Sequence, residues 1–122
     1  MATFRYLVRD VAESVAFYVG RLGFEELERY GPAMAIVRRG DLDLWLAGPA
    51  SSAARPMPDG RAPEPGGWAR IVITVDDLDG MVRDLTDAGA TFRNQIVTGP
   101  GGGQILIEDP SGNVVELFEP RA

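Results

Sequence analysis

The sequence of 122 residues contains no cysteine and no histidine. Without cysteine there is no disulfide, no thiol nucleophile and no thiolate ligand for a metal. Without histidine there is no Ser-His-Asp triad, no imidazole acid–base group and no example of the commonest metal ligand. Zinc sites built from these two residue types are therefore excluded. Any chemistry must come from carboxylates, arginine, tyrosine, hydroxyls, backbone amides or a bound cofactor.

Lysine is also absent, so the twelve basic residues are all arginines, against eighteen acidic residues and a net charge of −6. Such a chain, without a basic cluster, is poorly suited to nucleic acid or an anionic membrane surface. It contains no apolar run of about 18 residues that would span a membrane. The opening MATFRYLVRD lacks the apolar stretch of a signal peptide. We therefore expect a cytoplasmic protein whose partner is a small molecule, with no nucleic-acid or membrane partner.

One segment differs from the rest in composition. Residues 48–67 read GPASSAARPMPDGRAPEPGG and contain five prolines and four glycines. Such a segment forms neither a helix interior nor a paired strand, so we interpret it as a linker or flap. It divides a single domain, residues 1–122, into module one (1–47) and module two (68–122).

Each module shows the same order of local signals. In module one, Asp10 opens a D-x-x-E capping box and Gly23 ends the helix. In module two, a helix follows Asp76 or Asp77 and stops at Gly89. Strands are predicted over residues 4–8, 24–30, 33–39 and 42–47, and again over 70–75, 91–97, 104–108 and 113–119. The chain therefore reads as an α+β fold made of a βαβββ module written twice.

The two modules also align locally. VRDV from Val8 matches VDDL from Val75, and DLWL from Asp43 matches ELFE from Glu116. Few folds use a duplicated βαβββ module, so this organisation is the most specific statement that the residues themselves support.

Alternation along the strands assigns one face of each to the core and the other to a possible site. The second face mixes aromatic, aliphatic and charged residues, which is typical of a curved sheet around a small-molecule pocket. A subunit interface over the same face, with Arg70 paired to a carboxylate, is the other interpretation. The predicted ligand-binding residues are Arg5, Leu7, Asp43, Trp45, Arg70, Val72, Gln104, Leu106, Glu116 and Phe118.

Two stretches resemble a known family. The opening VRDVAESVAFYVGRLGFEE and the ending IEDPSGNVVELFEP look like the vicinal-oxygen-chelate superfamily, which includes glyoxalase I, extradiol dioxygenases and bleomycin-resistance proteins. The resemblance covers nearly the whole chain. It implies paired βαβββ modules whose eight strands form an incompletely closed barrel around a cavity, usually in a homodimer.

The resemblance also implies where metal-dependent members hold their ion. The four ligand positions fall at Thr3, near Asp43, at Arg70 and at Glu116. Only two of these can donate a carboxylate, and an arginine would repel a divalent cation. We therefore expect no metal and no cofactor, and a buried ion pair between Arg70 and Glu116 in place of the metal.

Three functions remain open. The sequence favours a metal-free protein that sequesters an aromatic or cationic compound, as drug-resistance members do, with Trp45 and Phe118 as stacking surfaces. The alternative is a lyase or isomerase that uses Asp43 or Glu116, its pKa raised by burial, as the catalytic base, or an incomplete carboxylate metal site. The third is a non-catalytic regulator. Arg38 is interpreted as part of a solvated face.

Overall fold

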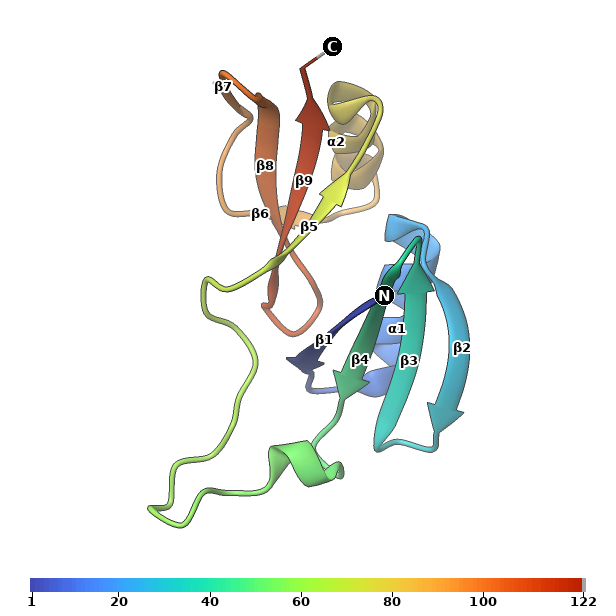
Figure 1. Ribbon diagram of the computed structural model, residues 1–122, viewed down its shortest axis with the longest axis vertical. Helices are drawn as coiled ribbons and strands as arrows, with labels where there is room; N and C mark the ends of the chain where they lie inside the picture. Colours follow the sequence, from blue (N-terminus) through green and yellow to red (C-terminus); the bar gives the residue numbers. More distant parts are fainter. Residues whose placement is uncertain (122) are drawn as a thin grey trace. The chain divides into compact units, whose positions relative to one another are not determined.

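A computed structural model describes residues 1–121 (Figure 1). The chain divides into two compact units: Met1–Gly66 with Pro110–Asn113, and Gly67–Asp109 with the segment from Val114 onward. The elements of the first unit are β1 (Ala2–Leu7), α1 (Val11–Leu22), β2 (Glu25–Tyr30), β3 (Met34–Arg39), β4 (Leu42–Ala47) and the short helix η1 (Ser52–Ala54). Those of the second are β5 (Ile71–Thr74), α2 (Leu78–Asp87), β6 (Thr91–Phe92), β7 (Val97–Gly99), β8 (Gly102–Glu108) and β9 (Val114–Pro120).

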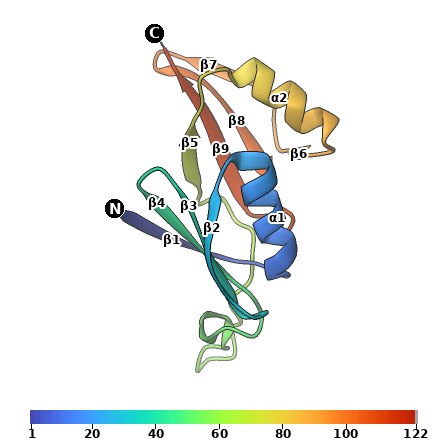
Figure 2. The same cartoon turned by 90° about the vertical axis from the view of Figure 1, so that its right-hand side faces the viewer.

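The first unit is a four-stranded sheet with α1 along one face (Figure 2). The strand order is β1-β4-β3-β2, with β1 parallel to β4 and the other pairs antiparallel. As predicted, the Asp10 side chain caps α1 by accepting from the Glu13 N–H, and Gly23 ends the helix with φ 75°. Tyr18 and Leu22 on the helix are fully buried, as are Leu44 and Leu46 on the sheet.

The second unit repeats this arrangement. Its strand order is β5-β9-β8-β6, with β5 parallel to β9, and β7 also pairs with β8. The Asp77 side chain caps α2 by accepting from the Gly80 N–H. Glu119 on β9 accepts from the Leu78 N–H at 2.7 Å, so the sheet holds the first turn of the helix. The fold is therefore α+β with two βαβββ-like modules and two mixed sheets, as expected.

The prediction of one continuous strand over residues 91–97 is wrong. The structure has two short strands there, β6 and β7, which both pair with β8. Between them the Leu106 N–H donates to the side chain of Asn94 at 2.9 Å. Because a side chain takes the position of a backbone carbonyl, the ladder is interrupted at that point.

The expected turn between β8 and β9 is present, and it belongs by its contacts to the first unit. Asn113 in this turn is 2% exposed. Its Nδ2 donates to the Leu7 carbonyl at 2.7 Å, and its Oδ1 accepts from the Gly66 N–H at 2.8 Å. The Arg9 N–H donates to Ser111 Oγ at 2.9 Å. One polar turn thus fixes the end of β1 and the end of the proline-rich segment.

That segment, residues 48–67, contains η1 and no other helix or strand, in agreement with its composition. Neither α1 nor α2 has the length and apolar character needed to cross a bilayer.

Candidate functional site

The face of each sheet away from its helix carries most of the predicted site residues, and its register can be compared between modules. The Val8 N–H donates to the Ala47 carbonyl at 2.9 Å, and the Val75 N–H donates to the Phe118 carbonyl at 2.8 Å. In both modules the helix cap follows two residues after the valine. Val8 therefore corresponds to Val75, and Ala47 corresponds to Phe118.

This register corrects the alignment made from the sequence. Two residues back from Ala47 and Phe118, Trp45 corresponds to Glu116, so the match between Asp43 and Glu116 is out of register by two residues. A shift of two residues is one full period of a strand and leaves each side chain on the same face. The alternation of side chains along the strand is the same in both alignments, so it could not reveal that the match was shifted by two residues.

In the first unit, Asp43 forms a two-pronged ion pair with Arg38 on the neighbouring strand. Arg38 Nε lies 2.6 Å from Oδ1 and Nη2 lies 3.1 Å from Oδ2. The hydrogen bonds from Arg38 hold the pKa of Asp43 below its ordinary value, although partial burial opposes them. The expectation that burial would raise this pKa is wrong, and Arg38 is not merely part of a solvated face.

Trp45 lies between two other side chains on the same open face. Its direct cross-strand neighbours are Arg5 on β1 and Ile36 on β3. The Arg5 guanidinium carbon is 5.0 Å from the centre of the Trp45 ring, a cation–π contact. The buried indole N–H of Trp45 has no hydrogen-bond partner among residues 1–121. Such a group costs about 1–3 kcal/mol when it stays unpaired.

In the second unit, Arg70 and Glu116 form the ion pair that the sequence predicted. Arg70 Nη2 is 3.0 Å and Nε is 3.1 Å from the same carboxylate oxygen, Oε1. The side chains are 30% and 11% exposed, so the pair is partly buried. Arg70 Nη1 also donates to the Trp68 carbonyl at 3.4 Å.

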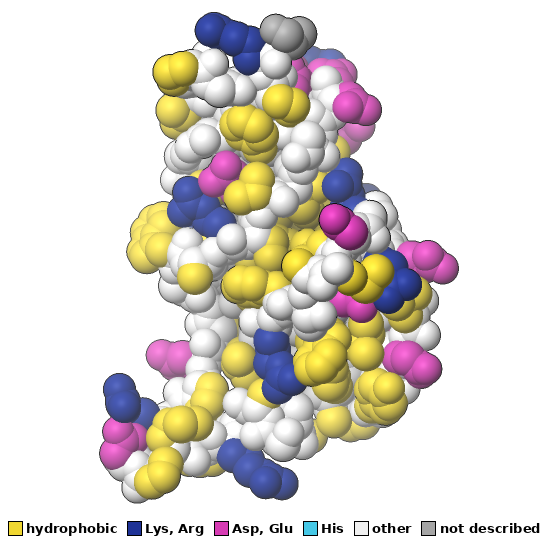
Figure 3. Space-filling view, in the orientation of Figure 1, with side chains coloured by type: hydrophobic (Ala, Val, Ile, Leu, Met, Phe, Trp, Pro, Cys, Tyr) yellow, Lys and Arg dark blue, Asp and Glu magenta, His cyan; other side chains and the backbone are white. Residues whose placement is uncertain are grey.

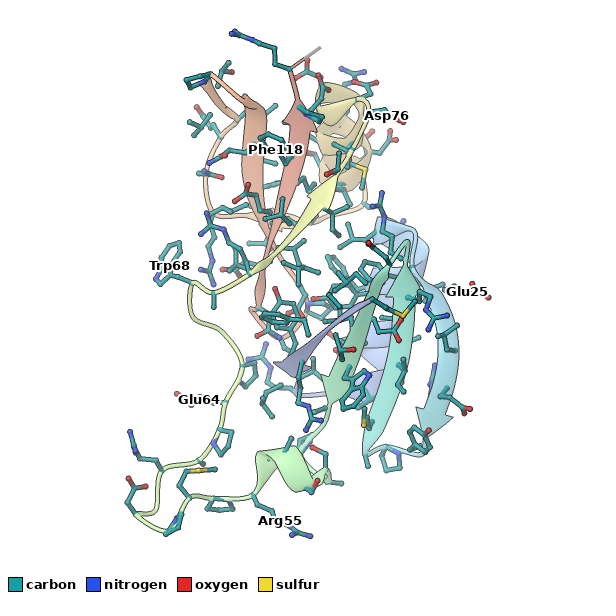
Figure 4. The ribbon with its side chains drawn as sticks, in the orientation of Figure 1. Glu25, Arg55, Glu64, Trp68, Asp76 and Phe118 are labelled. Atoms are coloured by element: carbon teal, nitrogen blue, oxygen red, sulfur yellow. The ribbon has the colours of Figure 1, made fainter. Side chains whose placement is uncertain are left out.

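A second ion pair in this unit was not predicted. Arg93 Nε donates to Glu108 Oε2 at 2.8 Å, and Nη1 donates to the Gly67 carbonyl at 2.7 Å. The Arg93 guanidinium lies over the ring of Trp68, 4.4 Å from its centre. Trp68 is 67% exposed and points away from the strands at the start of β5 (Figure 4). Alternation along the strand could have predicted Glu108 as a site residue, because it lies two residues after Leu106 on the same face. Alternation could not have predicted Arg93, because the strand expected there is interrupted after Phe92.

The predicted site residues fall into two groups, one in each unit. Within the second unit the register aligns Val72, Glu116 and Leu106 across three strands, and it pairs Gln104 with Phe118. The first unit holds Arg5, Leu7, Asp43 and Trp45.

A cavity of about 430 Å³ lies beside the start of α2, and another of about 620 Å³ lies beside the start of α1. Neither is lined by any of the ten predicted residues. Leu7 lines a smaller cavity of about 170 Å³ with Pro63 and Pro65 of the proline-rich segment.

The family of this chain is identified by a family model. The model of the Glyoxalase/Bleomycin resistance protein/Dioxygenase superfamily matches residues 1–117. The chain belongs to this superfamily. No curated protein that was compared matches the chain.

Several solved structures resemble the chain over 98% of its length. A superfamily member from Sphaerobacter thermophilus is 28% identical with a TM-score of 0.77, covering 98% of this chain and 95% of that one. TnmS3, an antibiotic binding protein from Streptomyces sp. CB03234, is 26% identical with a TM-score of 0.74, covering 98% and 93%. A lactoylglutathione lyase from Agrobacterium tumefaciens is 21% identical with a TM-score of 0.75, covering 98% and 92%, and shows the shared fold alone.

As a superfamily member, this chain departs from the metal-dependent pattern. With the corrected register, the four ligand positions that the resemblance implies hold Thr3, Trp45, Arg70 and Glu116. They provide one hydroxyl, one indole, one guanidinium and one carboxylate, and that carboxylate is already paired with the guanidinium. Within residues 1–121 no three acidic side chains gather as a metal site would require. This donor set does not fit the divalent-metal centre of the superfamily.

Proposed function

We propose that this superfamily member binds a small aromatic compound without a metal and sequesters it. The observation that supports this function is the neutralisation of the carboxylates on the open faces. Asp43, Glu108 and Glu116 are each paired with an arginine, namely Arg38, Arg93 and Arg70. The faces then offer aromatic and aliphatic surface, on which a planar ligand gains burial and stacking energy.

The same pairing distinguishes the two ligand classes that the composition favoured. A free carboxylate is the strongest partner for a cationic ligand, and these three carboxylates are already bound to arginines. An aromatic ligand needs only ring surface, which Trp45 and Phe118 provide. The likeness to TnmS3, an antibiotic binding protein, supports sequestration and a role in antibiotic resistance.

The alternative function, a lyase or isomerase with a carboxylate base, has weaker support. A base works best when its pKa lies near the working pH. The pKa of Asp43 is lowered instead, by its hydrogen bonds with Arg38. Glu116 is held beside the Arg70 guanidinium, which occupies one of its two carboxylate oxygens. Barrel-like closure and a homodimer remain predictions, which small-angle scattering and sedimentation equilibrium would test.

A titration followed by product analysis tests the proposal. A panel of planar aromatic natural products is titrated by calorimetry, and each bound compound is then recovered and its mass determined. We expect stoichiometric binding, recovery of unchanged compound, and the same affinity with EDTA as with Mn²⁺, Ni²⁺ or Zn²⁺. Conversion of a compound would overturn the proposal in favour of the enzyme. Absence of binding across the panel, or binding that requires metal, would also contradict it.

A further inference from the structure

The open face of the first sheet has two donor side chains without acceptors in the described part of the chain. The side chain of Arg5 is exposed and makes no ion pair or hydrogen bond with the rest of residues 1–121; its contact is with the ring of Trp45 at 5.0 Å. The buried Trp45 N–H has no partner within the same residues. The two side chains are direct neighbours on β1 and β4. A guanidinium and an indole N–H both donate and cannot satisfy each other.

Charged side chains lie on one side of this Arg5–Trp45 pair along the strands, and apolar side chains lie on the other side. In one direction along the strands lies the Arg38–Asp43 ion pair, whose charges cancel. In the other direction the neighbours are apolar, with Leu7 and Met34 both aligned on Ala47. Ile36 lies beside Trp45 on β3. The view of this face shows hydrophobic side chains and a basic one together over the strands of the first unit (Figure 3).

We propose that this face binds the carboxylate of a planar aromatic acid, with Arg5 and the Trp45 N–H as the two donors. This inference rests on the proposed function and names its ligand class. One carboxylate oxygen accepts from the guanidinium and the other from the indole, and the ring of the ligand covers Ile36 and Met34. Arg5 is free to turn toward the ligand because none of residues 1–121 holds it in an ion pair. The Trp45 N–H is buried in the free chain, so the ligand reaches it by displacing the side chains that cover it. Its positive charge acts locally, so binding of an anion does not depend on the sign of the net charge of the chain.

Three probes with one ring system test the charge preference. Naphthoate, naphthamide and naphthylmethylammonium are titrated into the full chain by calorimetry. We expect naphthoate to bind about tenfold more tightly than naphthamide, a difference of about 1.4 kcal/mol, and the ammonium compound to bind most weakly. Equal affinities, or a preference for the ammonium compound, would overturn the inference while leaving aromatic binding intact. If none of these three probes binds but other aromatic compounds do, the proposed carboxylate site is wrong and the proposed binding of aromatic compounds still stands.

Two variants locate the site. Arg5→Gln should remove the tenfold preference for naphthoate and leave the affinity for naphthamide unchanged. Arg83→Gln, at an exposed position on α2, is the matched control and should keep the preference. Trp45→Phe keeps an aromatic ring, removes the N–H and should also reduce the preference. Should Trp45→Phe fail to fold, the exposed Arg5 variant still decides the question.

A spectroscopic measurement follows the donor itself. The chain has two tryptophans, so its ¹⁵N spectrum has two indole signals, and Trp68→Phe assigns them. Saturating naphthoate should move the Trp45 indole proton downfield, as a new hydrogen bond does. No movement on binding would contradict the proposed contact. A shift that instead follows protein concentration, together with self-association in sedimentation, would show that a second copy covers this face and would overturn the proposal.

Discussion

Arg70 donates through both Nε and Nη2 to a single oxygen of Glu116, at 3.1 and 3.0 Å. The pair joins the residue before β5 to the middle of β9, and Glu116 is 9% exposed. Because only one carboxylate oxygen is used, the contact differs from the two-pronged geometry of Arg38 and Asp43. It fixes a positive charge where the superfamily resemblance implied a metal ligand.

Reversing the charge of Arg70 should destabilise the fold. In Arg70→Glu, two carboxylates face each other at a partly buried site, and we expect the free energy of unfolding to fall by about 1–3 kcal/mol, between the values for exposed and buried pairs. The double variant Arg70→Glu with Glu116→Arg should recover part of the loss. Urea denaturation measures both, with exposed Arg83→Glu as the control. Full stability in the single variant would show that the pair contributes nothing.

The Arg38–Asp43 pair should make stability depend on pH in the acid range. The pKa of Asp43 is lowered in the folded chain, so its contribution is fully present above the ordinary value of 3.8 and is lost as the pH falls through the folded pKa. Asp43→Asn should therefore be less stable than the parent near neutral pH and approach it at low pH. Denaturation midpoints at a series of pH values measure the difference. In an Arg38→Gln background the effect of Asp43→Asn should become smaller; a difference that is constant with pH would argue against this account.

Asn113→Ala should cost about 2–3 kcal/mol of unfolding free energy. The side chain is buried and satisfies the Leu7 carbonyl and the Gly66 N–H, and alanine leaves both without this partner. Exposed Gln95→Ala is the control and should change stability by less than about 0.5 kcal/mol. Thermal and urea unfolding compare the two variants, and equal stabilities would mean that the turn does not hold the first unit together.

Two adjacent glycines at the β7–β8 hairpin should respond differently to alanine. Gly102 has φ 144°, and a Cβ there would overlap the backbone carbonyl of Glu119. At Gly101 a Cβ meets only the ring edge of Phe118 at 3.8 Å. We expect Gly102→Ala to lose about 2–4 kcal/mol from backbone strain and overlap. Gly101→Ala should stay close to the parent; similar melting temperatures for the two variants would refute this difference.

Local signals predicted the helices well because capping is a local interaction. Asp10 and Gly23 set the ends of α1 through contacts within three to five residues. The interruption after β6 could not be predicted, because it depends on Asn94 reaching the Leu106 N–H across strands. The register error at Asp43 has a related origin, since pairing between strands far apart in the sequence decides which residue faces which.

The sequence by itself determined the duplicated βαβββ organisation, the superfamily and the absence of imidazole and thiolate ligands, because these follow from local pattern and residue type. The tertiary structure decided which arginine meets which carboxylate. Twelve arginines and eighteen acidic residues allow many pairings, and only strand register selects among them. It joined Arg38 to Asp43 and Arg70 to Glu116, and it placed Arg5 beside Trp45 with no carboxylate partner among the described residues.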